Sequence, residues 1–191
     1  MFPLKTGVNL FLQAYKKSEG NFFDREYQRL REILFSLFVC RALDILEKKE
    51  HFLLFHERQD MNDVSFITPS LTWAFKMQYF DVKEYTPRDP DNFDMFFQKI
   101  IKKSLNKDYN LIVWVHKNPQ SGSIEKIKWN EVKKSVFIIF WADEKDESWF
   151  KSRVTLISKE IVQLDEIIDL SDLIAPEDPP LFYDDKINIL L

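Results

Sequence analysis

Apolar residues change their spacing along this chain, and the changes predict a series of helices and strands. Residues 1–20 mix short apolar runs with charged residues and predict a helical or irregular lead-in. Asp24 can then cap a helix running to about Glu47, because its apolar positions recur at three- and four-residue intervals. Those positions are Tyr27, Leu30, Leu34, Leu37 and Phe38.

The next three apolar runs have the length and composition of strands. They cover residues 51–56, 63–67 and, in the longest run, 73–85, and turn-forming residues separate them. Three successive strands joined by short turns predict an antiparallel meander.

A clear amphipathic helix follows, which Asp91 or Asn92 can cap. Its apolar stripe consists of Phe93, Phe96, Phe97, Ile100, Ile101 and Leu105. Continuous apolar runs at 110–116 and 135–141 then predict buried central strands, with a short helical segment at 129–132 between them. Residues 147–168 predict a further helix, and residues 175–191 a loose acidic tail.

This order of elements predicts an α/β fold in the α+β range, a mixed β-sheet with flanking helices. A chain of 191 residues with 45% hydrophobic content fits one domain, with its core at about residues 22–141. The single cysteine, Cys40, excludes an intramolecular disulfide and a cysteine-based zinc site, and it fits a reducing, cytoplasmic setting. Neither a signal peptide nor a membrane span is expected.

The candidate catalytic residues are Asp81 and Lys83, which lie near the end of the longest predicted strand. Side chains on a strand alternate between its faces, so both are predicted to project to one side, beyond Met77 and Tyr79. A hairpin turn after the preceding strand would bring Asp63 alongside Asp81. Two carboxylates could then hold Mg²⁺ or Mn²⁺, while the lysine orients a water that attacks a phosphodiester.

In these residues and in its order of elements, the chain resembles the PD-(D/E)xK nuclease superfamily over residues 22 to about 118. That superfamily has a restriction-endonuclease-like αβββαβ core, with an acidic residue opening the second strand and an acid-x-lysine motif on the third. The resemblance implies that Asp63 and Asp81 are metal ligands and that Lys83 is the catalytic lysine. Two departures are Asn62, where many members have proline, and Asp81, where glutamate is more frequent.

The resemblance also implies a further ligand, whose identity stays open. Glu57 lies in an acidic segment that is similar to the approach to the site in nuclease domains of bacterial anti-phage defence proteins. Family members often add a glutamate from the first helix, for which Glu26 is the first choice and Glu32 the second.

The amphipathic helix carries candidate nucleic-acid contacts on its polar side. Lys99, Lys102 and Lys103 could meet backbone phosphates. Gln98 is at about the position on this helix where some exonuclease-like branches of the superfamily have a glutamine. Those branches have a tyrosine four residues later, where this chain has Lys102, so the chain is not assigned to them.

The expected function is therefore a divalent-metal-dependent endonuclease acting on nucleic acid, with DNA favoured over RNA, in host defence or restriction. A viral cap-snatching RNA endonuclease is a second setting, and cutting both strands of a duplex would favour a homodimer or larger complex.

The net charge of -4 argues against a protein that coats nucleic acid through a uniformly basic surface. The rival is a non-catalytic protein-interaction module with this fold, in which Asp81 and Lys83 are only a surface pair. The five tryptophans and eighteen phenylalanines are expected mostly in the core, although Trp73 and Tyr85 could flank a nucleic-acid groove by stacking.

Overall fold

The computed structural model describes most of the chain except several connections and the C-terminal segment. The described residues are 2–17, 27–55, 64–69, 75–86, 92–104, 110–115, 135–141, 150–158 and 161–174. The helices among them are α1 (Leu4–Lys17), α2 (Gln28–Glu47), α3 (Phe93–Ser104) and the short 3-10 helix η4 (Ser171–Leu173). The strands are β1 (Phe2–Pro3), β2 (Phe52–Phe55), β3 (Val64–Pro69), β4 (Phe75–Tyr85), β5 (Asn110–Val115), β6 (Val136–Trp141), β7 (Lys151–Ser158) and β8 (Ile161–Asp169).

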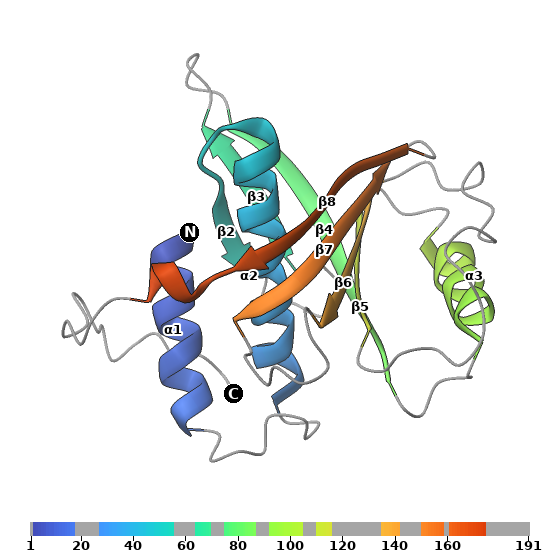
Figure 1. Ribbon diagram of the computed structural model, residues 1–191, viewed down its shortest axis with the longest axis horizontal. Helices are drawn as coiled ribbons and strands as arrows, with labels where there is room; N and C mark the ends of the chain where they lie inside the picture. The colour runs from blue at the N-terminus through green and yellow to red at the C-terminus, as the bar shows by residue number, and fades with distance from the viewer. Residues whose placement is uncertain are drawn as a thin grey trace.

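All eight strands form one mixed sheet, in which they follow one another in chain order (Figure 1). Neighbouring strands run antiparallel, except that β4 pairs with β5 and β5 with β6 in parallel. The predicted mixed sheet with flanking helices is confirmed, and so is the antiparallel meander, formed by β2, β3 and β4. Helix α3 lies in the connection from β4 to its parallel neighbour β5, as a parallel pair requires.

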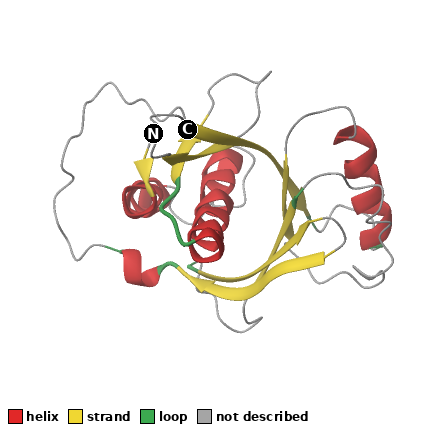
Figure 2. Cartoon of the chain, turned by 90° about the horizontal axis from the view of Figure 1, so that it is seen from above, coloured by secondary structure: helices red, strands yellow, loops and turns green. Residues whose placement is uncertain are grey.

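Helix α2 is the centre of the molecule, and the sheet curls around it (Figure 2). Every residue from Leu34 to Cys40 is buried, which amounts to nearly two turns with no exposed side. A helix that is apolar on all sides must be covered on all sides. Helix α1 and strands β2, β5, β7 and β8 supply the cover.

The two faces of the sheet bury separate apolar clusters, because side chains alternate along each strand. Trp114 of β5 points toward α2, where its ring meets Phe35 edge-on at a centroid distance of 3.5 Å. Its neighbours Val113 and Val115 point the other way and pack under α3. The face turned away from α2 is called the outer face below.

The N-terminal lead-in is helical as far as Lys17, as one of the two expectations had it. Helix α1 approaches α2 closely at Gly7, where a Cβ atom would lie only 2.7 Å from Cδ2 of Leu37. Asn92 caps α3 as predicted, since its side-chain oxygen accepts a hydrogen bond from the Met95 amide at 3.1 Å. The expectations for Asp24, Leu105 and the segments 129–132 and 175–191 lie outside the described residues.

The predicted helix at 147–168 is wrong, because strands β7 and β8 occupy this region. Buried positions in β7 recur at Ser152, Val154 and Leu156, which is the period of a strand. Pairing with the apolar strand β6 decides the outcome over local preference. As a result, the buried core reaches beyond residues 22–141 and includes residues of α1, β7 and β8.

None of the described helices has both the length and the apolar character needed to cross a bilayer.

One ion pair ties α2 to the sheet. Arg31 Nε lies 3.1 Å from Glu84 Oε1 on β4, and the two side chains are 7% and 14% exposed. Removing one partner of a buried ion pair leaves the other charge buried without that partner, which is strongly destabilising.

We therefore expect Arg31→Met to lower the free energy of unfolding by about 3–5 kcal/mol, measured by urea denaturation. Arg41→Met is the matched control, since Arg41 lies on the same helix and pairs with Asp172 at 3.7 Å, where the two side chains are 34% and 62% exposed. That variant should lose no more than about 1 kcal/mol. Equal losses in the two variants would contradict the role of the Arg31–Glu84 pair.

Candidate active site on strand β4

Strand β4 presents different residues to its two faces. Val82 is buried in the cluster around α2, and Glu84 pairs with Arg31 of the same helix. Because side chains alternate, Asp81 and Lys83 lie on the outer face. Asp81 and Lys83 therefore share one side of the strand, as the sequence predicts.

Asp81 and Lys83 form an ion pair. The ammonium of Lys83 donates to Asp81 Oδ1 at 2.6 Å and to the Val82 carbonyl at 3.2 Å. The Lys83 side chain is 38% exposed and that of Asp81 15%. A pair this open to solvent contributes at most about 1 kcal/mol to stability, so the fold depends little on it.

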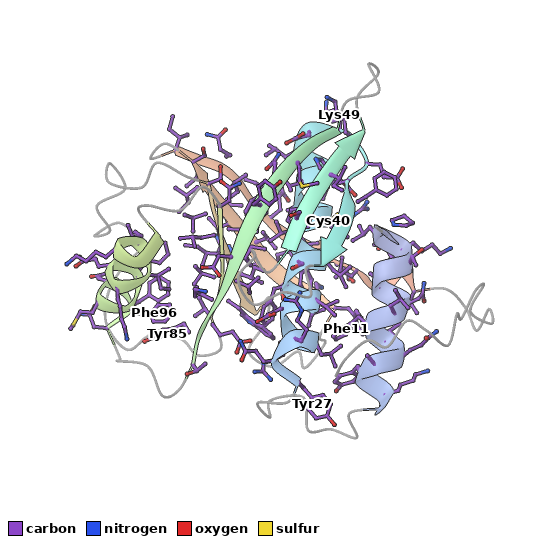
Figure 3. The ribbon with its side chains drawn as sticks, turned by 180° about the vertical axis from the view of Figure 1, so that it is seen from behind. Phe11, Tyr27, Cys40, Lys49, Tyr85 and Phe96 are labelled. Atoms are coloured by element: carbon purple, nitrogen blue, oxygen red, sulfur yellow. The ribbon has the colours of Figure 1, made fainter. Side chains whose placement is uncertain are left out.

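The outer face of β4 is open at one end and covered at the other. Met77 and Tyr79, which precede Asp81 on this face, are 38% and 40% exposed. Tyr85, at the far end, is fully buried and packs edge-on against Phe96 of α3 (Figure 3).

The expectation that Tyr85 stacks on a base is therefore wrong, because α3 covers it. Trp73, the other aromatic residue expected to do so, lies outside the described residues. Tyr79 lies two residues before Asp81 on the same face and is 40% exposed, but the sequence analysis does not single it out as a residue that could stack on a base.

Three of the four predicted metal ligands, Asp63, Glu57 and Glu26, lie outside the described residues. The fourth is Asp81. Within the described part of the chain, no three or more histidine, cysteine, aspartate or glutamate side chains gather as a metal site would require. Asp81 does offer the carboxylate oxygens that Mg²⁺ and Mn²⁺ prefer.

Glu32, the second choice from the first helix, is not brought to Asp81. Its carboxylate accepts hydrogen bonds from Arg29 at 2.7 Å and from Gln28 at 3.0 Å, both on α2. Helix α2 packs against the opposite face of β4, where Arg31 meets Glu84. The sheet therefore separates Glu32 from the outer face.

The polar side of α3 is exposed at Gln98, Lys99 and Lys102. The side chain of Lys103 lies outside what the structure describes. Helix α3 packs on the outer face, so these residues lie on the same side of the sheet as Asp81 and Lys83.

A second group of titratable side chains lies at the junction of α2 and β2. The buried imidazole of His51 places Nδ1 2.8 Å from Asp44 Oδ1 and Nε2 3.4 Å from Glu47 Oε2, the latter without a hydrogen bond. Burial lowers the pKa of His51, but the hydrogen bond to Asp44 and the charges of Glu47 and Asp44 together outweigh it and raise the pKa.

Among the residues that the structure describes, no activated nucleophile accompanies this group. The Cys40 thiol lies 3.5 Å from the His51 carbonyl oxygen, and burial, then the charges of Asp44 and Glu50, raises its pKa. Such a thiol is a poor nucleophile. The cluster therefore serves to hold the end of α2 against β2.

Comparison with known proteins finds no matching family model, no matching curated protein and no matching solved structure.

The raised pKa of His51 predicts a specific dependence of stability on pH. Its stabilising effect is fully present below the unfolded pKa of about 6.5 and is lost as pH rises through the higher folded pKa. We expect the free energy of unfolding to fall as the pH rises above about 6.5, where the carboxyl groups of aspartate and glutamate do not titrate. His51→Gln and Asp44→Asn should each flatten this slope in denaturation series. A slope unchanged in both variants would exclude His51 as its source.

Proposed function

We propose that the protein is a divalent-metal-dependent nuclease that hydrolyses phosphodiester bonds, in DNA by preference and in RNA as the second choice. Asp81 is a metal ligand and Lys83 the catalytic lysine. The observation that carries the proposal is the close Asp81–Lys83 pair on the open part of the outer face.

The topology around this pair supports the proposal. Helix α2, strands β2 to β4, helix α3 and strand β5 follow one another as in the αβββαβ core of the PD-(D/E)xK nucleases. Strands β2, β3 and β4 pair antiparallel, and β5 pairs with β4 in parallel. The acid-x-lysine motif lies on the third strand of that core, which is its position in the superfamily.

The pairing of β3 with β4 supports Asp63 as a second ligand. Val64 pairs with Phe80 across the two strands. Asp63 precedes Val64 in the chain and Asp81 follows Phe80. Because the two strands are antiparallel, each aspartate is one peptide unit of about 3.8 Å beyond the same end of this residue pair. Glu57 and Glu26 remain candidates for a third ligand from their sequence positions alone.

The chemistry of the site follows from these residue types. A bound Mg²⁺ or Mn²⁺ would polarise the scissile phosphate and lower the pKa of a water. The Lys83 ammonium, next to Asp81, is placed to orient that water and to counter the negative charge that develops on the phosphate. Lys99, Lys102 and Lys103 would contact the nucleic-acid backbone, with Gln98 beside them.

Tyr79 extends the site along the strand. It lies two residues before Asp81, a separation of about 6.6 Å along the outer face. An exposed aromatic ring at this distance from a phosphate site can stack on a neighbouring base that is not already stacked in a duplex.

A non-catalytic protein-interaction module is the second candidate. The exposed apolar residues Ile161, Val162 and Ile167 on β8 favour it. Metal binding distinguishes the two candidates.

For a nuclease, we expect Mn²⁺ to raise the thermal unfolding midpoint of the wild type and to have no such effect on Asp81→Ala. Lys83→Ala should still bind Mn²⁺ but lose at least about 100-fold in cleavage of plasmid DNA or single-stranded RNA. Lys5→Ala, an exposed change on α1, is the charge-matched control and should cleave at the wild-type rate. Wild-type protein that neither binds Mn²⁺ nor cleaves would refute the proposal and leave the interaction module.

The stacking role of Tyr79 can be measured separately on the Lys83→Ala background, which prevents cleavage. We expect Tyr79→Ala to weaken binding of a short single-stranded oligonucleotide by about 1–3 kcal/mol, or roughly 5- to 150-fold, in fluorescence anisotropy. Tyr79→Phe keeps the ring and should bind nearly as the parent does. Equal affinity of the alanine and phenylalanine variants would show that the ring makes no contact with a base.

A further inference from the structure

The Lys83 ammonium lies where a cation bound by Asp81 would lie. Its nitrogen is 2.6 Å from Asp81 Oδ1 and 3.2 Å from the carbonyl oxygen of Val82. Two oxygen atoms of strand β4 thus converge on one positive charge. Carboxylate and carbonyl oxygens are also the atoms that hard divalent cations bind in proteins. The ammonium therefore occupies the cation position of Asp81.

Asp81 cannot hold Lys83 and a divalent ion equally well at the same time. A metal ion on Oδ2, the second carboxylate oxygen, would bring a charge of +2 close to the ammonium on Oδ1. Charges of +2 and +1 repel twice as strongly as two unit charges at the same separation, and this repulsion exceeds what an exposed ion pair contributes. Binding of a metal at Asp81 therefore favours departure of the ammonium.

Lysine is the partner that can move. The Lys83 side chain is 38% exposed, whereas that of Asp81 is only 15% exposed. Lys83 also has a flexible four-carbon stem and three hydrogen-bond donors, so its ammonium can reach another acceptor after it leaves the carboxylate. On the same face of β4, Met77 and Tyr79 are 38% and 40% exposed, which leaves this side of the pair open to a ligand.

A phosphate group competes for the other partner of the pair. A phosphate held by the ammonium while the ammonium is on Asp81 Oδ1 would lie close to the carboxylate, and like charges repel. The phosphate is therefore bound better by an ammonium that has left Asp81. The metal takes Asp81, the phosphate takes Lys83, and each ligand leaves the second partner available to the other.

We propose that the Asp81–Lys83 pair makes the binding of a divalent metal and of a nucleic-acid phosphate cooperative, because the pair opens once for both ligands. The proposal rests on the nuclease function proposed above and concerns the regulation of its site. Coupling between two ligands is reciprocal, so each tightens binding of the other by the same factor. An exposed pair changes an equilibrium constant by at most about fivefold, which sets the size of this contribution.

The opening of the pair can be observed at Lys83 by nuclear magnetic resonance. In protein with isotope-labelled lysine, the ammonium signal of Lys83 is assigned by its loss in Lys83→Met. We expect Mg²⁺ to shift this signal toward its position in Asp81→Ala, in which the pair cannot form. A Lys83 signal that stays in place while the backbone amide signal of Asp81 responds to Mg²⁺ would overturn the proposal.

The affinity for Mn²⁺ alone measures the competition. Lys83→Met keeps most of the side-chain length and removes the charge. We expect it to bind Mn²⁺ about two- to fivefold more tightly than the wild type, measured from free Mn²⁺ by electron paramagnetic resonance. Lys5→Met, an exposed change on α1 with the same effect on net charge, should bind as the wild type does. A Lys83→Met variant that binds no more tightly than the wild type would contradict the competition.

Cooperativity is measured with thymidine monophosphate, which has no phosphodiester bond to cleave. The nucleotide at saturation should tighten Mn²⁺ binding by a factor that is about two- to fivefold larger in the wild type than in Lys83→Met. Mn²⁺ bound by the nucleotide in solution is subtracted in both series. The direct attraction between metal and phosphate acts in both proteins and cancels in this ratio.

The results also separate this proposal from the nuclease proposal. Equal factors in the two proteins, in a wild type that binds Mn²⁺ and cleaves nucleic acid, would refute the cooperative pair and leave the nuclease function intact. A wild type that neither binds Mn²⁺ nor cleaves would refute both.

Discussion

The burial of α2 on all its sides is the constraint on which the rest of this structure depends. The residues from Leu34 to Cys40 include five leucine, phenylalanine and valine side chains in nearly two turns, and each stabilises the fold by about 1.5–3 kcal/mol only when it is covered. A flat sheet covers one side of a helix. The curl of the sheet and the packing of α1 supply the remaining cover, which brings β7 and β8 across α2 (Figures 1 and 2).

The position of α2 also decides which residues of β4 can do chemistry. Since α2 takes the face with Val82 and Glu84, Asp81 and Lys83 have to lie on the other face. That face is only partly covered, because α3 is shorter than β4. Helix α3 has 12 residues and spans about 18 Å, whereas the 11 residues of β4 span about 36 Å. The helix covers Tyr85 and leaves Tyr79 open.

Sequence periodicity predicts those elements whose burial is regular. The β2–β4 meander, the apolar stripe of α3 and the continuous run of β5 were all confirmed for this reason. The hairpin of β7 and β8 was mistaken for a helix because Lys159 and Glu160, which separate the strands, give no turn signal. The different exposure of Tyr79 and Tyr85 could not be predicted, since both share one face of β4 and only the placement of α3 distinguishes them.

The Asp81–Lys83 pair is the part of the site that the sequence predicts best, and its energy bears on its use. Both residues come from one strand face at a spacing of two, so no tertiary information is needed to bring them together. A pair with 38% of the lysine side chain exposed contributes at most about 1 kcal/mol. Opening it is therefore inexpensive, and a divalent ion attracts the Asp81 carboxylate about twice as strongly as the ammonium does at equal distance. A weak pair of this kind can leave the carboxylate available to a metal and the ammonium available to a phosphate. A buried pair such as Arg31–Glu84, at 7% and 14% exposure, holds its partners too firmly for that exchange.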